Sequence, residues 1–439
     1  MKDTMHIVFL CGGSGTRLWP LSNEIRSKLF LEILPSPHGE RESMIGRVYR
    51  QLTASGLQES AIFVTSQEQS HLIARYAGSQ PPLIIEPFRR GTFAATALTA
   101  AYLIAHKMAE LDDIICITPA DMFVGEDYFS RFKLLPKILK AAKADLALLG
   151  TKPTTPSVQY GYIVPDLNKG KTSLEYFNVS SFLEKPDVGR AKVLMGQKAL
   201  WNCGVFAFPL QIILSYMEKI NLPTDYEELL SIYENLPIRS FDNEVAERIT
   251  NSIVLPYTGE WSDLGSWASL TEQLDVKVIG RGEISGESSN THLVNELPYS
   301  IHVIDVPDII VAASLEGVLI SKKSSANKIK ELRSDITISP KYNETSWGSY
   351  QVIDCSQDEQ NSNINTSKMT VLPHHHIAPQ IQHGSHKVWT ILTGTGEMVL
   401  DNNLYHVRSG DVYTIPVGSQ YSLTAIDKLE LMEVQFGSQ

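Results

Sequence analysis

Hydrophobic positions in the first third of the chain alternate between short, nearly continuous apolar runs and longer stretches with helical spacing. The apolar runs cover residues 6–11, 61–65, 83–86, 114–118 and 146–150. The helix-like stretches between them cover residues 43–55, 66–77, 92–109 and 129–144. Strands separated by helices in this order predict a parallel, doubly wound α/β sheet. Sites in such sheets lie at the carboxyl ends of strands, so residues 12–17 and 119–121 become candidates.

The pattern changes from about residue 283, where short strands and turns replace the alternation. Residues 300–306, 309–313 and 317–321 have the pattern of strands, and residues 324–333 have that of a helix. Beyond Trp347 the strand-like segments are 348–354, 368–372, 387–392, 396–400, 411–415 and 429–435. This spacing predicts a small all-β barrel or sandwich. The stretch 354–366, rich in Asn, Ser, Gln and Asp, is expected to be a mobile loop.

Length and composition narrow the possible classes of protein. A chain of 439 residues with 43% hydrophobic residues favours two or three well-filled domains. We expect the divisions 1–282, 283–340 and 345–439. With 38 Lys and Arg against 49 Asp and Glu, the formal charge of -11 argues against a duplex nucleic-acid binder. A pocket for a small phosphorylated substrate remains compatible with this charge, because a few basic residues and a metal suffice.

The cysteines and the apolar runs indicate in which cellular compartment the protein is expected. The four cysteines are far apart and form no CxxC pair, which argues against a disulfide framework or a zinc knuckle. No signal-peptide pattern occurs, and no apolar run approaches the roughly 18 residues that a spanning helix needs. A cytoplasmic protein without a membrane partner is the resulting expectation.

Three glycines follow the first strand directly, at Gly12, Gly13 and Gly15. Glycines at this place allow backbone N–H groups to approach phosphate oxygens, although they would also suit an ordinary tight turn. The Gly-Lys-Ser/Thr ending of a Walker A loop is absent, and Leu18 stands where a dinucleotide fingerprint needs its last glycine. Arg17 and Lys28 follow the loop and favour a polyphosphate ligand.

The loop and the segments after it resemble a known signature. The chain reads Gly12-Gly13-Ser14-Gly15-Thr16-Arg17-Leu18-Trp19-Pro20-Leu21-Ser22, followed by Lys28-Leu29-Phe30-Leu31. This resembles the sugar-nucleotide pyrophosphorylases, and the Leu-Trp-Pro-Leu-Ser continuation points to the mannose-1-phosphate guanylyltransferase (GDP-mannose pyrophosphorylase) family. Further motifs occur in the family's order across about residues 5–335: Glu86-Pro87, Pro119-Ala120-Asp121, Tyr160-Gly161-Tyr162-Ile163, Phe182-Leu183-Glu184-Lys185-Pro186, Trp201-Asn202-Cys203-Gly204 and Trp261-Ser262-Asp263-Leu264-Gly265-Ser266-Trp267.

The resemblance implies a Rossmann-like nucleotidyltransferase core with a mixed or parallel sheet, and it implies roles for individual residues. The implied catalytic residues are Arg17, Lys28 and Asp121. Asp121 and Asp263 would hold Mg²⁺ or Mn²⁺, although singly they would also suit a helix N-cap and a turn. The implied nucleotide-binding residues are Gly12, Gly13, Ser14, Gly15, Thr16, Arg17, Glu86, Arg90 and Thr92. The implied substrate-binding residues are Tyr160, Gly161, Glu184, Lys185 and Asn202.

The implied enzyme transfers GMP from GTP to mannose 1-phosphate, releases pyrophosphate and forms GDP-mannose for polysaccharide biosynthesis. Two departures from the family's nucleotide motif leave base and sugar open: Gly91 replaces an asparagine and Ala94 replaces a proline. One alternative is therefore a nucleotidyltransferase for another base or another sugar 1-phosphate, such as a deoxysugar or a heptose phosphate. An alternative of another class is a catalytically inactive regulatory protein that binds nucleotide sugars.

The region from 345 to 439 resembles the cupin of bifunctional mannose-6-phosphate isomerase/guanylyltransferases. Gln380 matches a metal ligand of that family, whereas other ligand positions are occupied by Gln382, Gly384, Lys387 and Tyr421. We therefore predict a degenerate cupin without isomerase activity. Five histidines lie close by, at 374–376, 383 and 386, either as exposed or interface residues or as a displaced metal site. A homo-oligomer formed through this part of the chain is possible.

Overall fold

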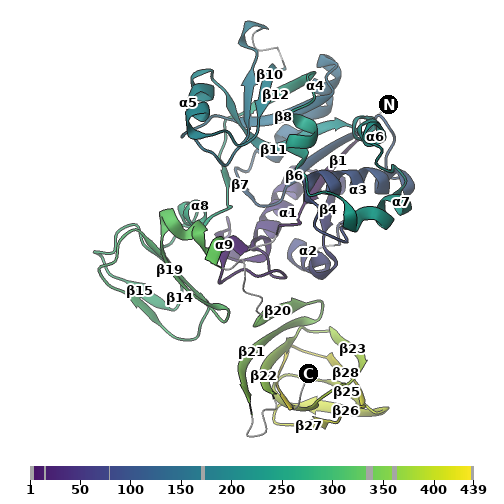
Figure 1. Cartoon of the computed structure of the whole chain (residues 1–439). Helices are drawn as coiled ribbons and strands as arrows, with labels where there is room; N and C mark the ends of the chain where they lie inside the picture. Colours follow the sequence, from purple (N-terminus) through teal and green to yellow (C-terminus); the bar gives the residue numbers. More distant parts are fainter. Residues whose placement is uncertain are drawn as a thin grey trace. The chain divides into compact units, whose positions relative to one another are not determined.

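The computed structural model describes residues 4–13, 16–78, 80–169, 174–332, 340–357 and 363–436 (Figure 1). The chain divides into two compact units. The first contains residues 1–13 and 32–265, and the second contains residues 14–31 and 266–439. The segment that carries Arg17 and Lys28 thus belongs to the second unit, although the glycines before it belong to the first.

A mixed nine-stranded sheet forms the centre of the first unit. Its strands are β1 (Met5–Leu10), β4 (Ala61–Thr65), β5 (Leu83–Ile85), β6 (Ile114–Pro119), β8 (Leu146–Thr151), β9 (Tyr162–Pro165), β10 (Phe177–Leu183), β11 (Leu200–Pro209) and β12 (Ser252–Tyr257). They lie in the order β5-β4-β1-β6-β11-β8-β12-β10-β9. Strand β1 pairs in parallel with β4 and β6, whereas β11 runs antiparallel to β6 and β8. Two short pairs accompany the sheet: β2 (Leu34–Pro35) with β3 (Arg41–Glu42), and β7 (Met122–Val124) with β13 (Trp261–Asp263).

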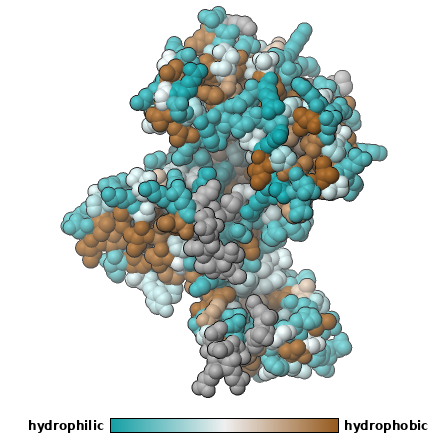
Figure 2. Space-filling model, in the orientation of Figure 1, coloured by the Kyte–Doolittle hydropathy of each residue, from teal (hydrophilic) through white to brown (hydrophobic). Residues whose placement is uncertain are grey.

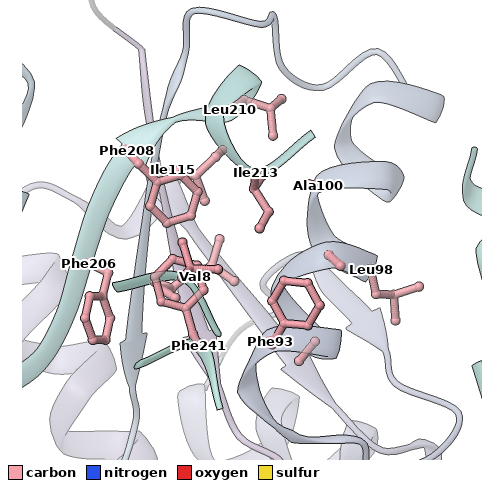
Figure 3. Packing of buried hydrophobic residues seen from close by; sticks show 14 of the residues in the cluster. Val8, Phe93, Leu98, Ala100, Ile115, Phe206, Phe208, Leu210, Ile213 and Phe241 are labelled. Atoms are coloured by element: carbon pink, nitrogen blue, oxygen red, sulfur yellow. The ribbon is translucent and has the colours of Figure 1, made fainter. Parts of the chain in front are cut away.

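Helices cover this sheet and bury its apolar side chains. They are α1 (Met44–Ala54), α2 (Ser70–Ala77), α3 (Gly91–Ala105), α4 (Leu135–Ala142), α5 (Val188–Gly196), α6 (Leu210–Lys219) and α7 (Tyr226–Ile232). On one face, Val8 of β1 and Ile115 of β6 belong to a core shared with α3 and α6 (Figure 3). On β1 the neighbouring Phe9 stacks on Phe63 with ring centroids 5.0 Å apart and meets Phe129 at 5.9 Å. Both faces of β1 are therefore buried, as its continuous apolar run predicts.

The second unit begins with a strand-rich connector. Its strands are β14 (Val278–Gly280), β15 (Gly282–Ile284), β16 (His292–Asn295), β17 (Ile301–Val303), β18 (Ile309–Ser314) and β19 (Gly317–Lys322), and its helices are α8 (Trp267–Glu272) and α9 (Ile329–Leu332). Arg26 ties the segment 14–31 to the connector through an ion pair with Glu296 at 2.9 Å. The indole N–H of Trp267 also donates to the Trp19 carbonyl at 3.2 Å. Figure 2 shows apolar surface over the connector, and Ile304 and Ile320 are among the exposed apolar residues of this segment.

The last part of the second unit is a β-barrel of two sheets. The larger sheet has the order β20-β21-β22-β29-β24-β27 and the smaller has the order β23-β28-β25-β26. The strands are β20 (Tyr342–Thr345), β21 (Gly348–Gln357), β22 (Asn363–Val371), β23 (His376–Ile381), β24 (His386–Thr393), β25 (Thr395–Leu400), β26 (Asn403–Arg408), β27 (Val412–Ile415), β28 (Gln420–Ala425) and β29 (Leu429–Phe436). Trp389, Ile391, Met398 and Leu431 are buried in its core. The predicted fold class, an α/β core followed by a β-rich connector and a cupin-like barrel, is confirmed.

One local expectation is wrong. The polar stretch 354–366 was expected to be a loop, but residues 354–357 continue β21 and residues 363–366 begin β22, with residues 358–362 outside the described ranges. Strand β22 alternates between positions whose side chains line the inside of the barrel, such as Asn363 and Asn365, and positions outside it. Its polar composition reflects a polar interior, which a composition rule interprets as a loop. Among the described helices, none is long and apolar enough to cross a bilayer.

Candidate functional site

A cavity of about 330 Å³ opens at the carboxyl ends of the central parallel strands of the first unit. Its wall combines the ends of β1, β4 and β6, the start of α3, the middle of β11 and the residues Phe241 and Asp242. Gly12, Gly13, Glu86, Thr92 and Asp121, all expected at a site, lie in this wall. Because the carboxyl ends of neighbouring parallel strands meet at one edge, residues distant in sequence come together here.

Gly12 and Glu86 lie next to each other in the cavity wall. A Cβ atom at Gly12 would lie 3.1 Å from Glu86 Oε2, so this carboxylate oxygen faces the glycine loop. The other oxygen, Oε1, accepts hydrogen bonds from the Tyr233 hydroxyl at 3.0 Å and from the Arg90 backbone N–H at 3.3 Å. Burial raises the pKa of Glu86, and the hydrogen bonds partly offset this effect. The hydrogen bonds to Oε1 therefore fix the Glu86 carboxylate, and its Oε2 remains as a buried acceptor beside the glycine loop.

The first residues of α3 pack closely against the segment that precedes Asp242. Gly91 has a φ of 86°, and a Cβ atom there would lie 2.4 Å from the Arg239 carbonyl oxygen. The Thr92 hydroxyl accepts a hydrogen bond from the Phe241 N–H at 2.8 Å. The departure from the family's asparagine at position 91 therefore has a conformational reason, since glycine adopts positive φ without a steric penalty. Thr92 holds the segment that brings Asp242 to the cavity.

Of the two arginines before α3, Arg89 lines the cavity. Sequence reasoning singled out Arg90, which contributes its backbone: its N–H donates to Glu86 and its carbonyl accepts from the Arg239 N–H at 3.3 Å. The Arg89 charge also lowers the pKa of Glu86, as the smallest of its causes. Adjacent arginines look equivalent in sequence, and only the backbone geometry distinguishes the one that faces the cavity.

Asp121 and Asp263 are brought close by a short pair of antiparallel strands. Asp263 is the register partner of Met122, the residue directly after Asp121. The Trp261 indole N–H donates to Met122 Sδ at 3.2 Å, which fixes the same pair of strands. Burial, and secondarily the charge of Asp121, raise the pKa of the Cys11 thiol at the end of β1. Asp121 directly precedes β7, and Asp263 ends the strand β13 that pairs with it, so two half-buried carboxyl groups lie near each other and could share a divalent cation.

The residues expected to bind the sugar also form one group. A Cβ atom at Gly161 would lie 2.5 Å from Glu184 Oε2 and 3.4 Å from the Asn202 Cβ, so a side chain there would displace the Glu184 carboxylate. Lys185 Nζ pairs with Glu184 Oε1. Tyr160 packs edge-to-face against Trp201 and Trp261, with centroids 4.8 Å and 5.3 Å apart. The group offers acceptors, donors and a cation beside an aromatic wall, which is the chemistry that a sugar phosphate requires.

Asp242 connects this group to the first cavity, and sequence reasoning missed it. The Asn202 amide donates to Asp242 Oδ1 at 3.2 Å, and Asp242 itself lines the cavity. Burial, and next the Glu184 charge, raise the pKa of Asp242 to about 6. Asp242 begins a π-helical turn, Asp242–Ala246, a feature that is frequent at functional sites. Its partners are 40 and 58 positions away in sequence, so no local spacing indicates it.

The remaining expected residues divide between the other unit and the undescribed positions. Ser14, Gly15 and the side chain of Thr16 lie outside the described residues. Arg17 and Lys28 lie in short 3-10 turns, Thr16–Leu18 and Lys28–Phe30, in the second unit. Their catalytic roles therefore stay predictions.

The barrel of the second unit shows what occupies the altered cupin positions. Gln382 is buried, and its amide donates to the Ser385 carbonyl at 2.8 Å. Lys387 Nζ lies 3.2 Å from Glu433 Oε2 and donates to the Tyr421 hydroxyl, also at 3.2 Å. The five nearby histidines are exposed. Within the described ranges, no group of three or more His, Cys, Asp or Glu side chains is arranged to hold a metal ion.

Comparison with protein-family models gives two matches. Residues 6–276 match the nucleotidyl transferase model, and residues 338–439 match the model of the mannose-6-phosphate isomerase C-terminal domain. The first match covers more than half of the chain. Both matches agree with the resemblance drawn from the motifs, which is confirmed.

Curated relatives match over nearly the whole chain. The alginate biosynthesis protein AlgA of Pseudomonas aeruginosa is 27% identical, over 98% of this chain and 93% of the relative. The xanthan biosynthesis protein XanB of Xanthomonas campestris is 28% identical, over 100% of this chain and 96% of the relative. Mannose-1-phosphate guanylyltransferase of Escherichia coli K12 is 25% identical, over 100% and 96%.

Among solved structures, a Thermus thermophilus protein described as mannose-1-phosphate geranyltransferase superposes with a TM-score of 0.62. It is 26% identical and covers 75% of this chain and 98% of its own. The match extends the agreement from sequence motifs to the arrangement of the strands and helices.

Proposed function

The chain belongs to the nucleotidyl transferase family, and on this premise we propose that it transfers GMP from GTP to mannose 1-phosphate. The products are GDP-mannose and pyrophosphate. Relatives named as a mannose-1-phosphate guanylyltransferase and as alginate and xanthan biosynthesis proteins support this choice of substrates and a role in polysaccharide biosynthesis. The reaction class follows from the family, whereas base and sugar rest on the site.

The observation that carries the choice of guanine is the buried Glu86 carboxylate beside Gly12. A carboxylate only accepts hydrogen bonds, and guanine offers two donors side by side, at N1 and at the N2 amino group. Glu86 Oε2 faces the glycine loop, and Tyr233 and the Arg90 N–H fix the other oxygen. Adenine presents an acceptor at N1, which a carboxylate would repel. The wall of the cavity therefore favours guanine over adenine.

The chemistry of the donors near Asp121 fits a divalent cation. Mg²⁺ is commonly held by one or two carboxylates together with substrate phosphates and water. Asp263 at the end of β13 and Asp121, which directly precedes the paired strand β7, supply such a pair. When bound, Mg²⁺ would neutralise charge on the α-phosphate and on the leaving pyrophosphate.

The sugar phosphate is proposed to bind at the group that joins Glu184 to Asp242. Glu184 and Asp242 would accept hydrogen bonds from sugar hydroxyls, and Asn202 holds Asp242 in position. Lys185, which pairs with Glu184 in this structure, would contact the phosphate of the sugar when the substrate is bound. A Glu184 N–H donates to Glu247 Oε1 at 3.0 Å, which fixes the turn that presents both residues.

In the proposed reaction an oxygen of mannose 1-phosphate attacks the α-phosphorus of GTP. A new P–O bond forms, the bond between the α-phosphorus and the bridging oxygen breaks, and pyrophosphate carries away the electron pair. No group of the protein needs to bond to phosphorus, so the residues act by positioning and by stabilising charge. Arg17 and Lys28 are proposed to bind the polyphosphate.

A substrate panel tests the proposal. Purified protein is incubated with Mg²⁺, each of the nucleoside triphosphates in turn and a set of sugar 1-phosphates, and released pyrophosphate is measured. We expect release to be fastest with GTP and mannose 1-phosphate. Release only with another base or sugar would reassign the substrate, and no release with any pair would favour the regulatory alternative.

The isomerase is proposed to be absent from the barrel. Lys387 places a positive charge beside Glu433, and a cation there would be repelled. Mannose 6-phosphate supplied with Zn²⁺ or Co²⁺ is therefore expected to remain unconverted. Formation of fructose 6-phosphate above the rate without protein would refute this.

A further inference from the structure

The inward faces of the barrel strands change from apolar to polar halfway along their length. On β22 the inward residues pass from Val371 and Met369 to Ser367 and Asn365. On β29 they pass from the buried Leu431 to Glu433 and Gln435. A barrel of this size is usually filled by apolar side chains, because a buried polar group without a partner costs free energy. Half of this interior is built for polar contacts.

These polar side chains surround a cavity of about 790 Å³, over twice the volume of the cavity in the first unit. Carboxamide groups come from Asn365, Gln380 and Gln435. In the part of the chain that the structure describes, the side chains of Asn365, Ser367 and Gln380 make no hydrogen bond. Donors and acceptors therefore remain on two strands of the wall, β22 and β23, for a ligand with many hydroxyl groups.

Aromatic rings complete the wall. Trp347 and Tyr350 are half-buried and line the cavity, and Tyr350 lies on β21, the strand paired with β22. A second hollow, of about 470 Å³, shares Trp347, Ile377 and Gln380 with it. Flat apolar rings combined with a few oriented polar groups are typical of small-molecule sites. The C–H face of a pyranose packs on such rings, and its hydroxyls bind carboxamides.

The charges inside the cavity cancel. Lys387 and Glu433 form an ion pair with N···O 3.2 Å, in which both side chains are largely buried. Glu433 Oε2 also accepts from the Trp389 indole N–H at 2.8 Å, and Lys387 donates to Tyr421. The remaining charged residue among those described in the wall, Lys341, is exposed. A phosphate near this pair would meet the Glu433 carboxylate, so an uncharged ligand is favoured over an anionic one.

We propose that the barrel cavity is a carbohydrate-binding site that takes a neutral sugar unit without a metal ion, through Trp347, Tyr350, Asn365, Gln380 and Gln435. The Lys387–Glu433 pair occupies the inside of the barrel in place of a metal and its ligands. The site is separate from the cavity of the first unit, and its occupancy can be measured without any transferase activity.

The test measures binding of methyl mannoside, methyl glucoside and methyl galactoside to the full chain by calorimetry, with EDTA present throughout. Glucose 1-phosphate and mannose 6-phosphate serve as anionic probes. We expect at least one neutral glycoside to bind at millimolar concentration or better, with an affinity that EDTA leaves unchanged. Binding of the phosphates alone, or binding only after Zn²⁺ replaces EDTA, would overturn the proposal, and so would binding of none of the probes.

Two substitutions locate the site. Gln380→Ala removes a wall carboxamide and is expected to weaken binding by about tenfold, the effect of one hydrogen bond to a ligand. Gln420→Ala is the matched control, because Gln420 precedes Tyr421 on β28 and is exposed outside the cavity. It should bind the glycoside as the unchanged protein does. Equal affinities of both variants and the unchanged protein, with unchanged thermal unfolding, would place the ligand elsewhere and refute the assignment.

Discussion

The walls of the two cavities differ in their charged residues: the first has an excess of carboxylates, and the second has a paired lysine and glutamate. The cavity of the first unit, about 330 Å³, has Glu86, Asp121 and Asp242 in its wall against Arg89. The cavity of the barrel, about 790 Å³, keeps its buried Lys387 and Glu433 paired with each other. An excess of carboxylates suits a site that binds anionic substrates together with a divalent cation. An internally neutralised wall has no need of a cation, so the first cavity is proposed to bind a divalent cation and the barrel cavity is proposed to bind its ligand without one.

The largest effect is expected where the metal would bind. Asp121→Asn removes one of the two carboxylates and should lower the rate of pyrophosphate release by at least about 100-fold, since charge on the leaving group loses its stabilisation. Asp112→Asn is the control, because Asp112 is exposed and lies just before β6, the strand that Asp121 follows, and this variant should retain the full rate. Comparable rates in the two variants would remove Asp121 from the catalytic role.

Removing the positive charge of Lys387 should lower the stability of the barrel and leave the transferase activity unchanged. Lys387→Met leaves Glu433 largely buried without its charge partner, and we expect a loss of about 3 kcal/mol in the free energy of unfolding of the barrel. Denaturant unfolding followed by tryptophan fluorescence measures this, because Trp389 contacts Glu433. Lys428→Met breaks an exposed pair with Glu430 and should cost under about 0.5 kcal/mol. Adding Glu433→Gln to Lys387→Met should recover most of the loss, and failure of this rescue would contradict the pairing.

Asp242 gives the first unit a dependence on pH. Its folded pKa of about 6 exceeds the ordinary value of 3.8, so the carboxyl favours the folded state most below pH 3.8, and this contribution is lost as pH rises through 6. Asp242→Asn should therefore raise the free energy of unfolding at neutral pH by roughly 3 kcal/mol, with no gain below pH 4. Urea unfolding across this pH range checks the difference. A gain that is independent of pH, or an equal gain in Asp112→Asn, would assign the effect to another cause.

The sequence predicts the elements of this fold better than it predicts the polar positions of its sites. The strand predicted at 61–65 has the same bounds in the structure, because Ala61–Thr65 is buried on both faces and is therefore apolar throughout. Asn363 and Asn365 lie on a strand although they were placed in a loop, because a polar interior reverses the usual pattern. Composition carries no information on whether a polar residue faces water or a cavity.

The residues of the candidate site likewise include some that the sequence predicts and one that it does not. Gly12, Glu86 and Asp121 were identified because they occur in recognisable motifs at strand ends, and the structure brings them to one cavity. Asp242 lies in no such motif, and its position depends on Thr92 and Asn202, which are far away in sequence. Long-range contacts of this kind become visible only when the fold is known.

The smallest effect concerns which base the first cavity accepts. Because Glu86 Oε1 accepts from Tyr233 and from the Arg90 N–H, Glu86→Gln would place its N–H₂ donor at the position of Oε2, where it would face the donors of guanine. We expect the preference for GTP over ATP, measured as the ratio of kcat/KM values, to fall by about tenfold, and the maximal rate with saturating GTP to change little. Glu59→Gln, at an exposed position between α1 and β4, should leave the ratio unchanged. A ratio that survives Glu86→Gln would place base recognition elsewhere in the wall of the first cavity.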